Sequence, residues 1–179
     1  VRYAKLRGEN ELANEIIQTK GQSDTNPALS PNDEFAGFEK QYRHLIGTNP
    51  PVVGRVSYSY VREALINGVG YQEYLGANPF KLGIVAGADA HTGFSDNEEF
   101  NYSGVHGNVD ATVKVRMSGA EQTAGEPAIN FGSPGATAVW APQNTREAIF
   151  DGIARKETYG TSGSLIRLRF FGGWGFDQG

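Results

Sequence analysis

One short stretch of the chain places a carboxylate and an imidazole two residues apart, in Asp89-Ala90-His91. In an extended backbone, residues i and i+2 point to the same side, so these two side chains would converge. A carboxylate and an imidazole are ligands for zinc, manganese or iron, and the pair therefore predicts a divalent metal site. The spacing alone favours a structural role, in which Asp89 caps a helix and His91 is a half-buried histidine.

The pair directly follows a continuous apolar run, Lys81-Leu-Gly-Ile-Val-Ala86, which is typical of a strand buried on both faces of a parallel sheet. Barrels and open α/β sheets place their ligands at the carboxyl ends of such strands. We therefore expect 81–86 to be an interior strand of a mainly parallel sheet, with Asp89 and His91 at its end. A second apolar run, Glu15-Ile-Ile-Gln18, predicts a neighbouring strand that would bring Glu15 to the same pocket.

Two further side chains are candidates for binding a substrate. Lys20 lies in a stretch rich in Gly, Pro, Ser, Asn and Asp that continues to about Glu34, and long loops in compact domains are often functional. Its ammonium group could hold a phosphate or a carboxylate, although a solvated lysine is the commoner outcome. His106 lies in a glycine-rich context from which it could reach over the metal site. His44, in a polar segment, is expected to be structural or exposed.

The elements around these residues follow from local patterns. Residues 136–140 predict a strand, and Asn144-Thr-Arg-Glu147 predicts the start of a helix with Asn144 as its N-cap. Residues 158–163 predict a turn, and the alternating 165–171 predict a strand.

An earlier helix is expected to begin near Ser57 or Ser59, to be interrupted at 67–70 and to end at Gly76. The alternating run 111–117 predicts one more strand.

Composition and charge exclude several classes of protein. The chain has a net charge of -4 and no cluster of more than two adjacent basic residues, so nucleic acid is not expected as a partner. No apolar run approaches the roughly 20 residues that a membrane span needs. The absence of Cys excludes thiolate metal sites and a Cys nucleophile. A bound metal is thus the simplest means of holding an anionic substrate.

Both ends read as cuts within a longer protein. The chain begins at Val1 without a signal-like segment, and it stops within an aromatic, glycine-rich stretch from Phe170 to Gly179. We therefore expect a fragment of a larger parent. The compartment stays open, and a periplasmic or secreted bacterial protein is compatible with a missing amino-terminal part.

A series of motifs resembles a large, uncharacterised bacterial family related to PHP (polymerase and histidinol phosphatase) proteins. Gly87-Ala-Asp-Ala-His91 is similar to the final metal-binding motif of PHP phosphoesterases. The wider series runs in the order Glu15-Ile-Ile-Gln-x-Lys-Gly-x-Ser-Asp24, Asn78-Pro-Phe-Lys-Leu-Gly, Ala88-Asp-Ala-His-Thr-Gly93, Asn144-Thr-Arg-Glu-Ala-Ile-Phe-Asp151, Lys156-Glu-Thr-Tyr-Gly-Thr-Ser-Gly163 and Ile166-Arg-Leu-Arg-Phe-Phe-Gly-Gly-Trp174. The resemblance covers nearly the whole chain.

The resemblance implies an α/β fold that is part of a PHP-like (β/α)7 barrel, with a mainly parallel sheet, helices, glycine-rich insertions and a terminal β segment. Residues 1–135 would form the carboxyl-side part of the barrel with an insertion. Residues 136–179 would form a strand-helix-strand unit that completes the barrel or leads to a further domain.

The resemblance also implies a cluster of two or three metals at the strand ends. Asp89 and His91 carry over as ligands, and Glu15 falls where such proteins place an acidic residue. The first PHP motif, His-x-His, is absent from this sequence. We therefore expect divalent metal (zinc, manganese or iron) to be bound fully only together with the rest of the parent chain.

The implied function is a metal-dependent hydrolase, a phosphoesterase that acts on a small phosphorylated substrate through a metal-activated water. Asp89, His91 and Lys20 would carry the catalytic roles, and Lys20 or His106 would contact the substrate. Two alternatives stay open. One is a non-catalytic binding or interaction domain in which the Asp89 and His91 pair is structural, and the other is metal-dependent hydrolysis of a C–N or C–O bond.

Overall fold

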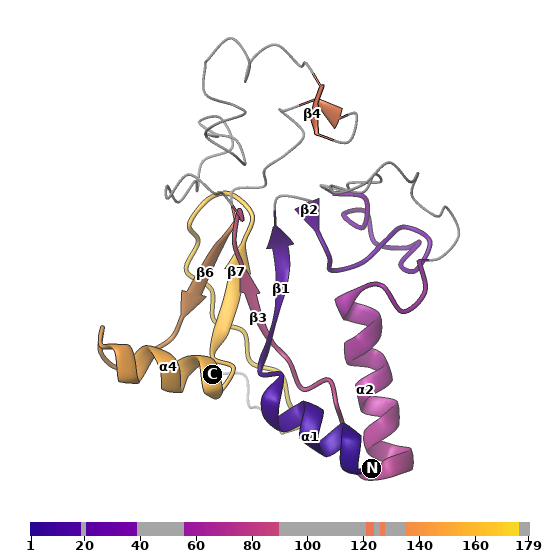
Figure 1. Cartoon of the computed structure of the whole chain (residues 1–179), viewed down its shortest axis with the longest axis vertical. Coiled ribbons are helices and arrows are strands. Elements are labelled where there is room, and N and C mark those ends of the chain that lie inside the picture. Colours follow the sequence, from indigo (N-terminus) through magenta and orange to yellow (C-terminus); the bar gives the residue numbers. More distant parts are fainter. Residues whose placement is uncertain (19–20, 39–55, 90–120, 124–125, 128–134, 176–179) are drawn as a thin grey trace.

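The computed structural model describes residues 1–18, 21–38, 56–89, 121–123, 126–127 and 135–175. Within them the elements follow in the order α1 (Arg2–Asn10), β1 (Ala13–Gln18), β2 (Gly21–Gln22), α2 (Val61–Leu75), β3 (Gly83–Ala86), β4 (Glu121–Thr123), β5 (Glu126–Pro127), β6 (Ala136–Val139), α4 (Arg146–Ala154) and β7 (Thr158–Thr161). Figure 1 shows β1, β3, β7 and β6 side by side, with α1 and α4 at one end of them.

β1 and β3 pair in parallel, with Glu15 opposite Val85. The pairing continues past the end of β3, where the Gly87 N–H donates to the Ile17 carbonyl at 2.9 Å. The prediction of two neighbouring strands is thus confirmed. β3 lies at the edge of the three-stranded sheet β2-β1-β3, however, and not at the interior position expected for 81–86.

Side chains cover the outer edge of β3. The Thr137 hydroxyl of β6 accepts a hydrogen bond from the Ala86 N–H at 2.9 Å and donates one to the Ala86 carbonyl at 2.7 Å. One hydroxyl therefore satisfies the backbone groups that a further strand would otherwise pair. β7 packs closely here because Gly160 has no side chain: a Cβ at that position would lie only 2.6 Å from the Ala86 Cβ.

The expected (β/α)7 barrel with a mainly parallel sheet is wrong. The described strands form one mixed sheet of three strands, β2-β1-β3, and two antiparallel pairs, β4–β5 and β6–β7, with no closed barrel among them. The β6-α4-β7 unit shows the physical reason. α4 crosses the end of the two strands and does not run back along them (Figure 1), so the chain re-enters at the same end, with Val139 opposite Thr158.

α2 is continuous where an interruption was expected at 67–70. Gly68 is buried there, and a Cβ at this position would clash with the Asn78 side chain, so the glycine serves close packing and does not break the helix. The N-cap residue is Tyr60, not one of the preceding serines. The predicted end is confirmed, because Gly76 adopts a left-handed conformation with φ of 65°.

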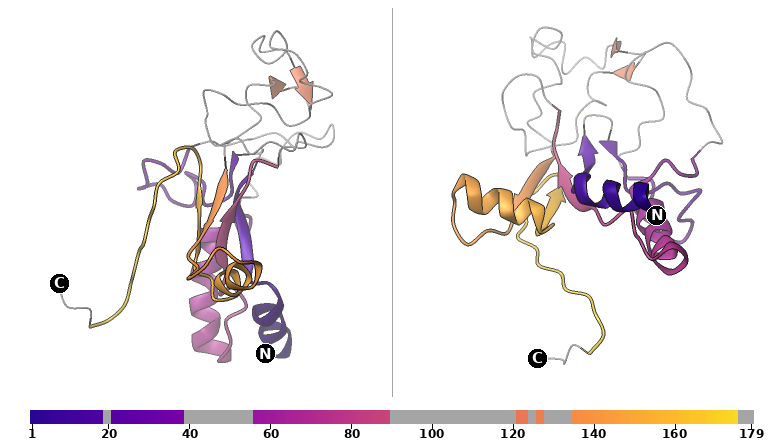
Figure 2. Two further views of the ribbon diagram at one scale, coloured as in Figure 1. Left: turned by 90° about the vertical axis from the view of Figure 1, so that its left-hand side faces the viewer. Right: turned by 60° about the horizontal axis from the view of Figure 1, so that its bottom comes forward.

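The segment after β7 also differs from expectation. β7 itself lies where a turn was expected, and 165–171, expected as a terminal strand, is extended without strand pairing among the described residues. Figure 2 shows this segment leaving the body of the molecule. The Tyr159 hydroxyl donates to the Ile166 carbonyl at 2.7 Å and accepts from the Leu168 N–H at 3.2 Å. Trp140 Nε1 donates to the Leu168 carbonyl at 3.1 Å, so side chains hold the segment.

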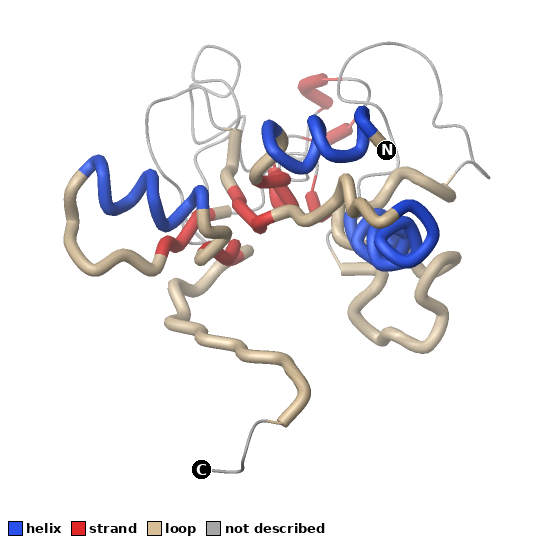
Figure 3. The backbone as a smooth tube through the Cα atoms, turned by 90° about the horizontal axis from the view of Figure 1, so that it is seen from below, coloured by secondary structure: helices blue, strands red, loops and turns tan. Residues whose placement is uncertain are grey.

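The three described helices lie on different sides of the strands, as the view from below shows (Figure 3). The apolar side chains buried among the described residues are mostly small: Ala4, Ile17, Ala36, Val61, Ala77, Ala86 and Ala88. None of the helices in the described ranges combines the length and apolar character that crossing a membrane requires.

Candidate functional site

The carboxyl ends of β1 and β3 bring a predicted site residue against the neighbouring strand. Gln18, the last residue of β1, donates from Nε2 to Asp89 Oδ2 at 2.9 Å. Asp89 follows the end of β3, is exposed, and has a left-handed backbone with φ of 51°. Asp tolerates this conformation better than most residues, at a cost on the order of 1 kcal/mol. Asp89 lies beyond the strand end and outside a helix, as predicted, but its left-handed backbone is not the extended conformation from which the convergence of Asp89 and His91 was expected.

Glu15 of β1 extends its carboxylate toward the same end. Its Oε1 lies 3.0 Å from the place where a Cβ on Gly87 would sit, so the carboxylate lies beside Gly87, two residues before Asp89. A side chain at Gly87 would displace the flexible end of Glu15 slightly. Glu15 and Asp89 are both exposed and come from neighbouring parallel strands.

The other predicted site residues, Lys20, His91 and His106, lie outside the described residues. Within the described ranges, no group of three or more His, Asp or Glu side chains gathers at one place. The donor set of Glu15 and Asp89 consists of carboxylate oxygens, which suit manganese and are also accepted by zinc. Both residues therefore have the chemistry of metal ligands, and a complete site would need further ligands.

A cavity of about 400 Å³ lies between β1 and the start of α2, and Glu15 and Gln18 line one side of it. Its lining also includes Arg7, Asn14, Ser23, Tyr58, Ser59, Tyr60, Phe80 and Leu82. This cavity was not predicted, because the residues around Ser57 and Ser59 indicated only the start of a helix. The cavity adjoins the predicted site through Glu15, and through Gln18, which donates to Asp89.

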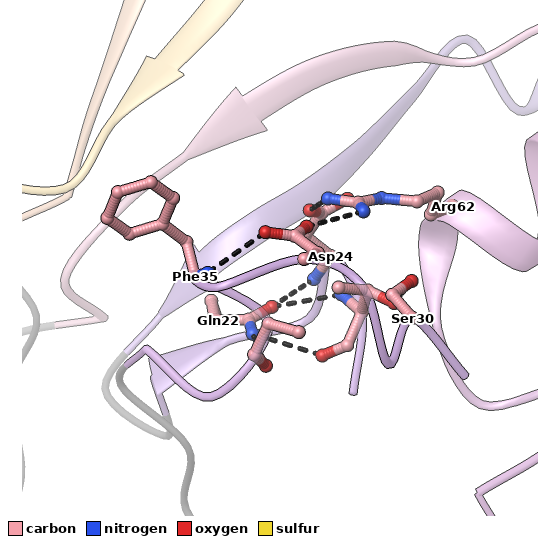
Figure 4. Close-up of polar contacts among 8 residues, drawn as sticks. Gln22, Asp24, Ser30, Phe35 and Arg62 are labelled. Atoms are coloured by element: carbon pink, nitrogen blue, oxygen red, sulfur yellow. Dashed lines mark hydrogen bonds and ion pairs between the residues drawn. The ribbon is translucent and has the colours of Figure 1, made fainter. Parts of the chain in front are cut away.

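One glutamine holds the loop that follows β2 (Figure 4). Gln22 Oε1 accepts from the backbone N–H groups of Asp24 at 2.6 Å and Thr25 at 3.1 Å. Its Nε2 donates to the carbonyls of Thr25 at 3.0 Å and Ala36 at 3.2 Å. A single side chain therefore satisfies four backbone groups of a loop that has little regular secondary structure.

An arginine connects this loop to α2. Arg62 forms ion pairs with Asp24 and, at 2.7 Å, with Asp33. The hydrogen bond from Arg62, with a second from the Phe35 N–H, holds the pKa of Asp33 below its ordinary range, and the two carboxylates raise the pKa of Arg62. The N–H groups of Val61 and Arg62 donate to loop carbonyls, each at 3.0 Å, so these amides at the start of α2 already have partners.

A second cavity, of about 370 Å³, lies between β7 and the segment that follows it. The Arg169 guanidinium lies 4.3 Å from the centre of the Trp140 ring and 5.9 Å from that of Phe171. Of the predicted site residues that the structure describes, neither Glu15 nor Asp89 lines this cavity. It is formed by the contacts that hold the extended segment.

A protein family model described as "Protein of unknown function (DUF3604)" matches residues 1–179. No match was found among curated proteins or among solved structures. The description of the family names neither a reaction nor a ligand, so the resemblance to PHP proteins stays a prediction.

Proposed function

We propose, for a chain that belongs to the DUF3604 family, a metal-dependent hydrolase that cleaves a phosphate ester with a metal-activated water. The observation that carries this proposal is the hydrogen bond from Gln18 to Asp89, at 2.9 Å, which joins the carboxyl ends of two parallel strands. The Glu15 carboxylate lies beside Gly87, two residues before Asp89, and comes from the same strand as Gln18. Carboxylates near the ends of two neighbouring strands support a cation site here.

The chain's own residues would bind and orient. Glu15 and Asp89 would be the described ligands of a divalent metal, with His91 as the third predicted ligand. Gln18 donates to one oxygen of Asp89 and so fixes the direction of its carboxylate. A metal bound there would lower the pKa of a water and polarise the phosphoryl oxygens.

The test uses the full-length protein that carries this sequence. Metal content is measured after dialysis, and hydrolysis of p-nitrophenyl phosphate is measured with zinc, manganese or iron. We expect Asp89→Asn, His91→Ala and Glu15→Gln each to lower turnover by about 100-fold or more, because each variant removes a proposed metal ligand. Glu147→Gln, an exposed carboxylate on α4, is the matched control and should leave turnover unchanged. A metal-free protein, or an Asp89→Asn variant with normal turnover, would refute the proposal.

A second candidate function, an interaction domain, is favoured by a separate observation. The segment after β7 exposes several large apolar side chains: Leu165, Ile166, Leu168, Phe170, Phe171 and Trp174. Exposed apolar surface of this kind is typical of binding sites for other proteins.

A panel that adds amide and carboxylic ester substrates would distinguish hydrolysis of a C–N or C–O bond from hydrolysis of a phosphate ester. Inactivity toward every substrate of the panel would favour the interaction domain.

A further inference from the structure

We propose that the cavity between β1 and α2 binds a neutral, polyhydroxylated group such as a sugar ring. The inference rests on the proposed function in one respect, because this group would be the non-reacting part of the phosphate ester. The cavity shares Glu15 and Gln18 with the proposed metal site, so a ligand in it would extend from that site. Its volume of about 400 Å³ falls within the range of small-molecule sites.

The first argument is the mixture of donors and acceptors in the lining. The residues that line the cavity include Ser23, Tyr58 and Tyr60, which carry hydroxyl groups, Gln18, which carries an amide, and Glu15, which carries a carboxylate. Sugar hydroxyls both donate and accept hydrogen bonds, and this set offers both kinds of partner. The aromatic rings add apolar faces of the kind that cover the C–H face of a sugar.

The second argument is charge, which disfavours an anion in this cavity. Arg7 is the only cation in its described lining, and it is already engaged: its Nε donates to Glu11 at 2.6 Å and its guanidinium lies 4.7 Å from the centre of the Phe80 ring. Glu15 adds a carboxylate to the lining. The amides of Val61 and Arg62 at the nearby helix start donate to loop carbonyls and are not directed at a ligand.

The third argument is the conformation of Tyr58. This residue has a left-handed backbone with φ of 65°, and its side chain is 85% exposed although it lines the cavity. Its N–H donates to the Glu63 carboxylate, which holds the strained turn in place. Strained backbone that is fixed in this way is frequent at ligand sites.

The test measures binding to the full chain without added metal, by NMR titration with glucose, galactose and mannose and, for comparison, glucuronate and inorganic phosphate. We expect at least one neutral sugar to bind, and glucuronate and phosphate to bind about tenfold more weakly because of Glu15. Tyr58→Ala should weaken sugar binding about fivefold or more. Tyr74→Ala is the matched control, since Tyr74 is 86% exposed on α2 and does not line the cavity.

A second variant tests the role of charge. Glu15→Gln should narrow the difference between glucuronate and the neutral sugar, because it removes the repulsion without changing the size of the side chain. Absence of binding by all three sugars, tighter binding of phosphate, or equal binding by Tyr58→Ala and the wild type would overturn the inference. Asp89→Asn separates the two proposals: it should keep sugar binding and lose hydrolysis, and normal hydrolysis in this variant would refute only the metal site.

Discussion

At the scale of single residues, Arg62 joins the loop after β2 to α2 through Asp24 and Asp33. The pKa of Asp33 is lowered in the folded protein by its hydrogen bond from Arg62, so its contribution to stability is fully present above the ordinary value of 3.8 and is lost as the pH falls through the lowered value. We therefore expect Asp33→Asn to lower the melting temperature at neutral pH and to have a smaller effect below about pH 3. Thermal unfolding followed by circular dichroism over this range measures both.

Glu73→Gln replaces an exposed carboxylate on α2, the helix that carries Arg62, and controls for the general loss of one negative charge. If the melting temperature of Asp33→Asn stays below that of the wild type by a constant amount down to acid pH, the ion pair is not the source of the difference.

At the scale of elements, the start of α4 gives a direct comparison between two adjacent side chains. The Thr145 hydroxyl accepts from the Ala148 N–H at 3.3 Å and forms the N-cap that the sequence had assigned to Asn144. We expect Thr145→Ala to lower the free energy of unfolding by about 1 kcal/mol and Asn144→Ala to leave it nearly unchanged. Denaturant unfolding of both variants measures this, and the reverse order of effects would return the cap to Asn144.

The same scale shows why prediction from sequence succeeded only in part. Apolar runs identified β1, β3 and β6 because burial of a strand is recorded in its own residues. The residues of β7 predicted a turn because they include Gly160. The glycine is needed there because Ala86, far away in the sequence, leaves no room for a side chain. The alternating 165–171 has the pattern of a strand but lacks a partner to pair with among the described residues.

The candidate site divides in the same way. Asp89 and Glu15 were predicted because carboxylates can bind metals. Asp89 also follows one apolar run, and Glu15 belongs to another. Gln18 was missed because its amide does not titrate. Its role appears only through its hydrogen bond to Asp89. The barrel was wrong because it was inferred from resemblance, whereas the direction in which α4 leaves β6 determines the pairing of β7.

At the scale of the whole molecule, the extended segment after β7 is attached by few contacts. The Tyr159 hydroxyl makes hydrogen bonds to Ile166 and Leu168 within it. We expect Tyr159→Phe to release the segment and to speed cleavage by trypsin after Arg167 and Arg169 several-fold, since proteolysis follows the population of the open state. Limited digestion followed by mass spectrometry measures the rate.

Tyr3→Phe, on the exposed surface of α1, is the control for loss of a tyrosine hydroxyl. Equal cleavage rates in Tyr159→Phe and the wild type would assign the attachment to Trp140 and Arg169 instead.

The parallel pairing of β1 with β3, and the contact of Thr137 with Ala86, also determine how the chain must fold. Gln18 and Asp89 are 71 residues apart, and Ala86 and Thr137 are 51 residues apart. Long loops must therefore close before these contacts contribute any stability. Chains dominated by such distant pairings fold slowly, in milliseconds to seconds, and expose unpaired strand edges meanwhile. The contacts that assemble the candidate site are thus expected to form late, and the yield of folded protein should depend on protein concentration during refolding.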